Sequence, residues 1–106
     1  MIEWTMDGQR VTQRVMRDWE AKFGDRKYLK LTVRNVGKRW LVNLYAVARG
    51  PRAAMAEFKH GFFAREDWAN DLSLGLLKPG ETAAFIARLT ATGDPGETPR
   101  ITVEER

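Results

Sequence analysis

The chain has 106 residues, a formal net charge of +4 and no cysteine. This length suits one domain over residues 1–106 with one core, which neither a disulfide nor a thiolate metal site can stabilise. There is no run of about 18 apolar residues and no signal-peptide segment at the N-terminus, so we expect a protein that is synthesised and kept in the cytoplasm. Its 18 basic side chains are interspersed with 14 acidic ones, which argues against a dedicated nucleic-acid binder.

Residues 1–27 combine a predicted hairpin with a helical pattern. Asp7-Gly8 separates two short runs, 2–6 and 9–12, and favours a two-residue β-hairpin turn. Apolar side chains then recur every four residues and a glycine follows, which is typical of an amphipathic helix with a glycine cap. These residues are Val11, Val15, Trp19 and Phe23, followed by Gly24. We predict a short helix or turn over about 15–23, and a strand continuing through 10–15 is the alternative.

The segment from Tyr28 to Val47 predicts a central hairpin of two alternating runs. In the first run one side is apolar, formed by Leu29, Leu31 and Val33, and the other is polar. The second run has apolar groups on both sides and therefore predicts a strand that is covered on both faces, with Trp40 in the core. The joining segment Asn35-Val36-Gly37-Lys38 contains asparagine and glycine, which supply the left-handed backbone conformations of a tight turn.

Four more strands are predicted after Gly50-Pro51. They fall within residues 53–63, 72–76, 82–92 and 101–103. The third is the clearest, because its apolar side chains occupy every second position from Ala83. Lys78-Pro79-Gly80-Glu81 has the central proline and glycine of a type II turn. Trp68 lies in a polar segment, 64–70, that suits a single helical turn.

About seven short strands separated by turns indicate a β-sandwich. Three pieces together resemble bacterial immunoglobulin-like domains of the CARDB-like and fibronectin-like type. They are Leu31-Thr32-Val33-Arg34-Asn35-Val36-Gly37, Leu77-Lys78-Pro79-Gly80-Glu81-Thr82 and the alternating strand 83–91. The resemblance implies an all-β, immunoglobulin-like antiparallel β-sandwich with a short helical insertion near the N-terminus and a sandwich core over 28–103. The segment around Trp19 departs from the family pattern, so strand order, and sandwich against jelly roll, stay open.

Residue types that carry catalysis are sparse. His60 is the only histidine and Ser73 the only serine, so a hydrolytic triad is not expected. One histidine beside Lys59 lacks the convergent donors of a metal site. The adjacent acids Glu66-Asp67 and Glu104-Glu105 point apart on a strand or turn, whereas acid–base catalysis needs convergence. We therefore expect no enzymatic activity, no cofactor and no metal.

Large aromatic side chains in irregular, polar segments are the candidate interface anchors, since such rings bury much area at a small entropic cost. They are Trp4, Trp19, Phe62, Phe63 and Trp68. Closing the ends of a small sandwich is their alternative role. A candidate basic face near Tyr28 and Tyr45 comprises Lys30, Arg34, Lys38 and Arg39.

These features predict a non-enzymatic structural or interaction module that docks on a larger assembly, as phage virion accessory and capsid decoration proteins do. The partner would be a capsid or other virion protein, with incorporation into the virion, and a homo-oligomer is a further option. A carbohydrate- or peptide-binding module that uses Trp68 and Phe62-Phe63 or a sheet edge is the alternative. Nucleic-acid binding through the basic face is a third hypothesis, and no membrane partner is expected.

Overall fold

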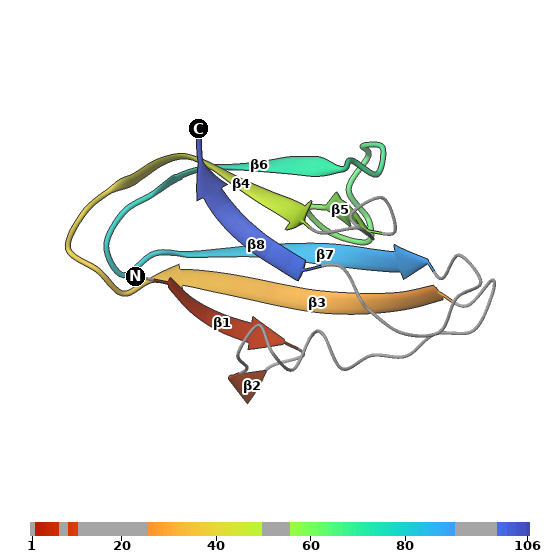
Figure 1. The fold of residues 1–106 in the computed structure, drawn as a ribbon, viewed down its shortest axis with the longest axis horizontal. Helices are drawn as coiled ribbons and strands as arrows, with labels where there is room; N and C mark the ends of the chain where they lie inside the picture. Colours follow the sequence, from red (N-terminus) through yellow and green to blue (C-terminus); the bar gives the residue numbers. More distant parts are fainter. Residues whose placement is uncertain (1, 7–8, 11–25, 50–55, 91–99) are drawn as a thin grey trace.

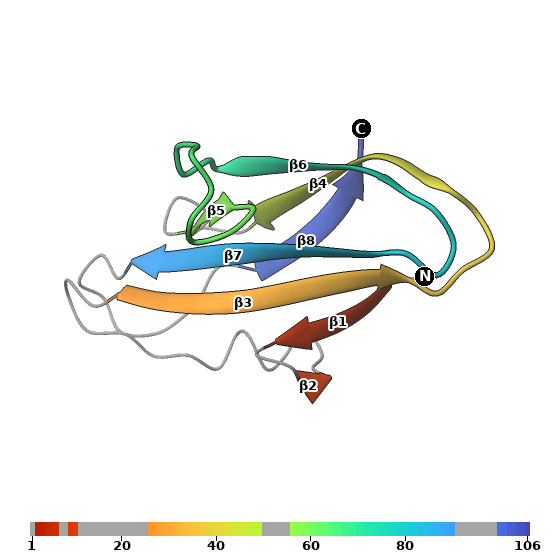
Figure 2. The same ribbon diagram turned by 180° about the vertical axis from the view of Figure 1, so that it is seen from behind.

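The computed structural model describes residues 2–6, 9–10, 26–49, 56–90 and 100–106. Within these ranges the chain forms strands and turns without a helix, and so no helix long and apolar enough to cross a membrane. The strands form two antiparallel sheets that pack against each other, as Figures 1 and 2 show. The all-β prediction is confirmed for this part of the chain. The helix predicted over about 15–23 lies outside the described residues.

Sheet A has five strands in the order β2-β1-β3-β7-β5, and sheet B has three in the order β6-β4-β8. The strands of sheet A are β1 (Ile2–Met6), β2 (Gln9–Arg10), β3 (Arg26–Asn35), β5 (Ala56–Lys59) and β7 (Thr82–Thr90). Those of sheet B are β4 (Leu41–Arg49), β6 (Asp71–Leu77) and β8 (Arg100–Glu105). The predicted N-terminal hairpin is confirmed, because Met6 pairs with Gln9 between β1 and β2.

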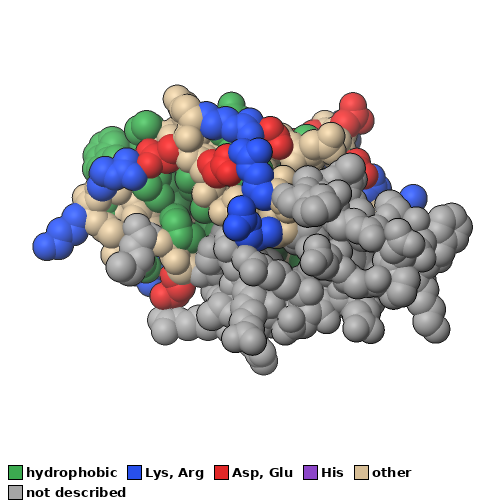
Figure 3. All heavy atoms as spheres, viewed as in Figure 1, with side chains coloured by type: hydrophobic (Ala, Val, Ile, Leu, Met, Phe, Trp, Pro, Cys, Tyr) green, Lys and Arg blue, Asp and Glu red, His purple; other side chains and the backbone are tan. Residues whose placement is uncertain are grey.

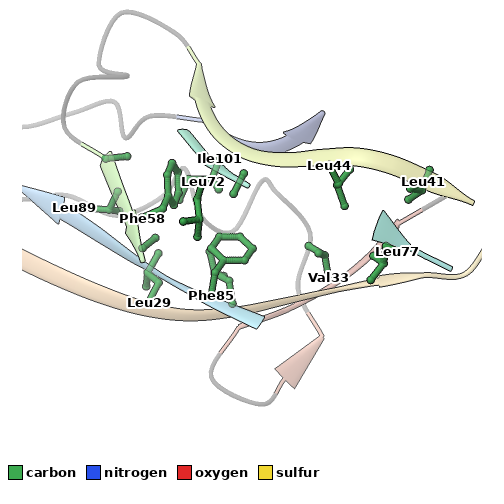
Figure 4. Close-up of a cluster of buried hydrophobic side chains, with 14 residues drawn as sticks. Leu29, Val33, Leu41, Leu44, Phe58, Leu72, Leu77, Phe85, Leu89 and Ile101 are labelled. Atoms are coloured by element: carbon green, nitrogen blue, oxygen red, sulfur yellow. The ribbon is translucent and has the colours of Figure 1, made fainter. Parts of the chain in front are cut away.

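The core lies between the sheets, where side chains from both point toward one another (Figure 4). In β7 the predicted alternation is confirmed, since Phe85, Ala87 and Leu89 are all buried in this core. Phe85 meets Phe58 of β5 edge to face, with 5.8 Å between the ring centroids. Burial of one such side chain contributes about 1.5–3 kcal/mol to folding.

The predicted central hairpin is wrong. β3 belongs to sheet A and β4 to sheet B, so the segment between them crosses from one sheet to the other (Figure 1). Neither Asn35 nor Gly37 has a positive φ angle. Instead the Asn35 side-chain Oδ1 accepts a hydrogen bond from the Gly37 N–H at 3.0 Å, an Asx turn that redirects the chain without reversing it.

Asn35 is completely buried and joins two turns. Its side-chain Nδ2 donates to the carbonyls of Arg39, at 2.8 Å, and Leu77, at 3.0 Å. Its backbone N–H donates to the Glu81 carbonyl at 3.0 Å, and its carbonyl accepts from the Gly80 N–H at 2.7 Å. The 36–40 turn is thereby fastened to the 78–81 turn. We call these two turns and Asn35 the Asn35 end.

The predicted 78–81 turn is confirmed. Gly80 has a φ angle of +85°, the value that the third residue of a type II turn requires. The Glu81 N–H donates to the Lys78 carbonyl at 3.0 Å, and the Glu81 carboxylate accepts from the Lys78 N–H at 2.8 Å. The turn is therefore closed by backbone and side chain together.

A bulge in β4 changes which residues face the core. Leu41 pairs with Leu77, but Leu44 pairs with Gly75, so β4 has one residue more than β6 in this interval. Asn43 lies in the extra length with a φ angle of +48°. Because a bulge adds one residue, Leu41 and Leu44 both face the core although their spacing is odd.

The expectation that Trp40 fills the core is therefore wrong. Its side chain is 53% exposed, because the neighbours of the buried pair Leu41–Leu77 point away from the core. Val42 and Leu76 are exposed for the same reason. The Trp40 ring is covered in part by Lys78, whose Nζ lies 5.0 Å from the ring centroid. An alternating count that starts from Leu44 misses the bulge and places Trp40 on the wrong face.

Candidate interaction surface

Residues 60–69, which follow β5 and lead to β6, form a loop that we call the aromatic loop. At its base, Phe58 and Ala69 exchange two backbone hydrogen bonds of 2.7 and 2.9 Å. At its tip, the Ala64 N–H donates to the Gly61 carbonyl at 3.2 Å, which closes a four-residue turn. Phe62 and Phe63 are the two central residues of that turn. The helical turn predicted over 64–70 is wrong, because Ala69 extends the edge of sheet A instead.

His60 closes the loop between base and tip. Its backbone N–H donates to the Glu66 carboxylate at 2.7 Å, and its ring Nδ1 lies 2.8 Å from both carboxylate oxygens. Its ring Nε2 lies 2.8 Å from the carbonyl oxygen of Ser73 in β6. Three elements therefore meet at one imidazole: the end of β5, the loop and β6.

The surroundings of His60 favour its charged form. The Ser73 carbonyl is the largest cause that raises the pKa of His60; partial burial acts in the opposite direction, and the hydrogen bond and charge of the Glu66 carboxylate raise the pKa further. Hydrogen bonds from the His60 backbone and ring lower the pKa of Glu66. Because both ring nitrogens face acceptors, the imidazolium, which donates from both, fits this site. The Ser73 hydroxyl takes no part in these contacts.

The aromatic loop folds back onto the outer face of sheet A. Tyr28 of β3 receives Phe62 with ring centroids 5.7 Å apart, and Trp68 with centroids 6.1 Å apart. Phe63, in contrast, is 99% exposed. The loop therefore uses two of its rings for its own support and presents the third to solvent.

Cationic side chains surround Trp68. The Arg88 guanidinium lies 4.4 Å from the Trp68 ring centroid, and the Lys59 Nζ lies 5.6 Å from it. Arg88 also donates to the Glu57 carboxylate at 3.1 Å. Such cation–π contacts are worth about 0.5–2 kcal/mol each. Trp68 is thus held in place over sheet A by residues of β5 and β7.

The structure brings together three of the five predicted anchors, Phe62, Phe63 and Trp68, and adds Tyr28 to them. Trp4 lies in β1 in register with Val33, and its side chain is outside the described part. Trp19 also lies outside the described residues. The anchor prediction thus has a geometric counterpart at the aromatic loop.

The predicted basic face is divided between the two sheets. Lys30 and Arg34 point outward from β3 in sheet A, and Lys38 is exposed in the 36–40 turn. Arg39 donates to the Glu105 carboxylate in sheet B. Tyr45 lies in sheet B beneath the Arg106 guanidinium, 4.8 Å from its ring centroid, and away from Tyr28.

Ion pairs neutralise much of the charge on sheet B. They are Arg39–Glu105, Arg49–Glu104 and Arg106–Asp71. Basic and acidic side chains accordingly intermingle on the face shown in Figure 3. Among the described residues of sheet B, Arg39, Arg49 and Arg106 are thus each paired with a carboxylate.

Sequence reasoning missed the partners of Trp68 and the role of Asn35. Both depend on contacts between residues far apart in the chain, and no local pattern signals them. A local signal did exist for the loop tip, since Gly61 and Ala64 frame two phenylalanines within the span from His60 to Glu66.

Comparisons with protein-family models, with curated proteins and with solved structures give no match.

Proposed function

We propose that this protein is a non-enzymatic interaction module that docks on a partner protein through the aromatic loop. The observation that supports this proposal is the full exposure of Phe63 on a loop closed at three levels. Burying a phenylalanine side chain contributes about 1.5–3 kcal/mol. Because hydrogen bonds already hold the loop backbone in place, the entropic cost of ordering it on binding is small, and it offsets little of this contribution.

The charges around the loop favour a partner with an acidic rim. Lys59 and Arg88 lie over Trp68, and Lys30 of β3 is in register with Ile86 of β7, which pairs on its other side with Lys59. Glu57 is paired with Arg88 and Glu66 with His60. An apolar pocket for Phe63 bordered by carboxylates would complement this surface.

We also propose that the two-sheet fold is immunoglobulin-like and that the partner belongs to a large assembly with an acidic surface, such as a virion shell. Two of the three sequence pieces that carry the family resemblance, around Asn35 and around Gly80, meet at the Asn35 end. The net charge of +4 suits an acidic surface.

Site-specific photocrosslinking tests the docking proposal. A photoreactive phenylalanine analogue replaces Phe63 in the full chain, and the matched control carries it in place of Trp40, an exposed ring at the Asn35 end. Both proteins are irradiated in extracts of the organism that produces this chain and in preparations of its purified virion particles. Adducts are identified by mass spectrometry.

We expect one dominant protein adduct from position 63 that is absent from position 40. Phe63→Ala should then weaken binding of that protein about 30-fold, the effect of losing about 2 kcal/mol at a hot spot. Equal adducts from both positions, or no adduct, would contradict the proposal.

Carbohydrate binding is less well supported by the geometry. A sugar needs an open aromatic face with hydrogen-bonding groups beside it, but Arg88 and Lys59 lie over the Trp68 ring. Asp71, an acidic residue close to Trp68 in the chain, pairs with Arg106 of sheet B at 2.7 Å. Peptide addition to the β5 edge meets Ala69, which already pairs with Phe58.

Single-stranded nucleic acid is a second candidate, favoured by aromatic rings beside Lys30 and Lys59 on one sheet face. Anisotropy of a labelled oligonucleotide tests it at about 50 mM salt and at rising salt concentrations. Binding that falls steeply with salt and is lost in Phe63→Ala would favour this function. No binding at the lowest salt concentration would exclude it.

A further inference from the structure

We propose that His60 is a pH-sensitive clasp of the aromatic loop, which holds Phe63 in its presented position when the imidazole is protonated and loosens when it is neutral. The effect on docking rests on the proposed function. The clasp itself is a property of the chain alone and can be tested without a partner.

The contacts of His60 require two donors. Nδ1 faces the Glu66 carboxylate and Nε2 faces the Ser73 carbonyl, each at 2.8 Å. Neutral imidazole carries one N–H, so loss of the proton sets a nitrogen lone pair against one of these acceptors. One contact must then open, either the one within the loop or the one that ties it to β6.

The position of the clasp couples it to the loop tip. Phe62 and Phe63 lie between His60 and Glu66 in the chain, inside the turn that Ala64 closes. The loop then remains joined to sheet A by the Phe58–Ala69 backbone pair at its base and by the contacts of Phe62 and Trp68 with Tyr28. Opening the clasp removes the constraint that spans the loop tip between His60 and Glu66, which raises the conformational entropy that docking must overcome.

Within the part of the chain that the structure describes, few other charges act on the clasp. The Glu66 carboxylate faces His60 from the loop, and the uncharged Ser73 carbonyl faces it from β6. Lys59 at the end of β5 acts on Glu66 and helps to lower the pKa of that carboxyl. The titration of the clasp is therefore controlled by His60 and Glu66.

The direction of each pKa shift gives the pH window. The pKa of His60 is raised from 6.5, so its stabilisation is complete below about 6.5 and is lost as pH rises through the raised value. The pKa of Glu66 is lowered from 4.5, so its stabilisation is complete above about 4.5 and is lost as pH falls through the lowered value. The clasp is strongest between about pH 4.5 and 6.5.

Nuclear magnetic resonance offers a direct test, because His60 is the only histidine and its ring signals are unambiguous. The pKa of His60 is measured in the wild type and in Glu66→Gln. Amide exchange of Ala64 and His60, divided by the intrinsic rate at each pH, is followed from about pH 5 to about pH 9. The amides of Asn35 and Gly80 at the other end serve as internal controls.

We expect a lower His60 pKa in Glu66→Gln than in the wild type, and weaker protection of the two loop amides above the wild-type pKa. When exchange occurs through opening of the loop alone, the opening equilibrium constant depends on the His60 pKa in the closed and in the open loop. It changes tenfold across the titration for each pH unit by which the pKa in the closed loop exceeds that in the open loop. His60→Gln, which does not titrate, should remove this dependence. Equal pKa values in both proteins, or loop protection that is independent of pH in the wild type, would overturn the clasp.

The clasp and the docking proposal fail in different ways. A confirmed titration with no adduct from position 63 would leave the clasp and remove the docking. If the clasp controls docking, affinity should decrease as the fraction of molecules with a closed clasp decreases. A dominant adduct whose yield does not change across the titration of His60 would therefore keep the docking proposal and overturn the effect of the clasp on docking.

Discussion

At the Asn35 end, a buried side chain joins two turns, whereas the aromatic loop at the other end is closed by contacts that water reaches (Figures 1 and 2). Hydrogen bonds of a buried amide gain strength from the low local dielectric and are costly to lose. Those of His60 and Glu66 join titratable side chains that water reaches. The two ends thus differ in how their turns are held, and the proposed docking surface lies at the more accessible end.

The exposed rings at the two ends also differ. Trp40 is the last residue of the 36–40 turn, directly before β4, and lies against Lys78. Phe63 lies at the tip of a turn with almost all of its surface in water. A partly covered ring at the surface is common in proteins, whereas the almost complete exposure of Phe63 is the observation behind the proposed docking role.

The largest effect is expected from Asn35→Ala. It leaves the carbonyls of Leu77 and Arg39 and the N–H of Gly37 without their partner. Losing buried hydrogen bonds of this kind should cost about 3 kcal/mol. Urea denaturation measures it, and Val36→Ala, a neighbouring exposed residue, should cost less than about 0.5 kcal/mol. A cost below about 1 kcal/mol for Asn35→Ala would remove the distinction between the ends.

Trp68→Ala should have an intermediate effect. It removes the contact with Tyr28 and the cation–π contacts of Arg88 and Lys59, which together are worth about 2 kcal/mol. Trp68→Phe retains a ring in the same place and should lose less than half of that. If both variants are as stable as the wild type, the loop is not supported by sheet A in the way described.

Trp40→Ala should have the smallest effect on stability, about 1 kcal/mol or less, because the ring is half exposed. A core tryptophan would cost about 3–5 kcal/mol. Urea denaturation of Trp40→Ala distinguishes the two positions of the ring. A loss of about 3–5 kcal/mol in the free energy of unfolding would indicate a core position for Trp40 and contradict the β4 bulge.

Much of the fold follows from local patterns in the chain. The alternation in β7 and the Pro79-Gly80 turn were predictable because period two and turn chemistry act over a few residues. The bulge at Asn43 was not, since one extra residue changes the phase of a strand without changing its composition. The hairpin predicted at Asn35 was wrong for a related reason, because asparagine and glycine are favoured both in hairpin turns and in Asx turns.

The candidate site was predictable only in part. Residue type alone singled out Phe62, Phe63 and Trp68 as anchors. The contacts of Phe62 and Trp68 with Tyr28 depend on the pairing of β3 with β7 and of β7 with β5 in sheet A, a long-range arrangement that local propensity does not encode. The role of His60 depends on the Ser73 carbonyl across the loop, a contact between residues thirteen apart.

The most direct test of the account compares the two ends in one binding experiment. The affinity of the protein that crosslinks to position 63 is measured by titration calorimetry for the wild type, Phe63→Ala and Trp40→Ala. If the aromatic loop is the docking surface, Phe63→Ala weakens binding about 30-fold and Trp40→Ala less than about 3-fold. Loss of binding in Trp40→Ala with full affinity in Phe63→Ala would place the docking surface at the Asn35 end instead.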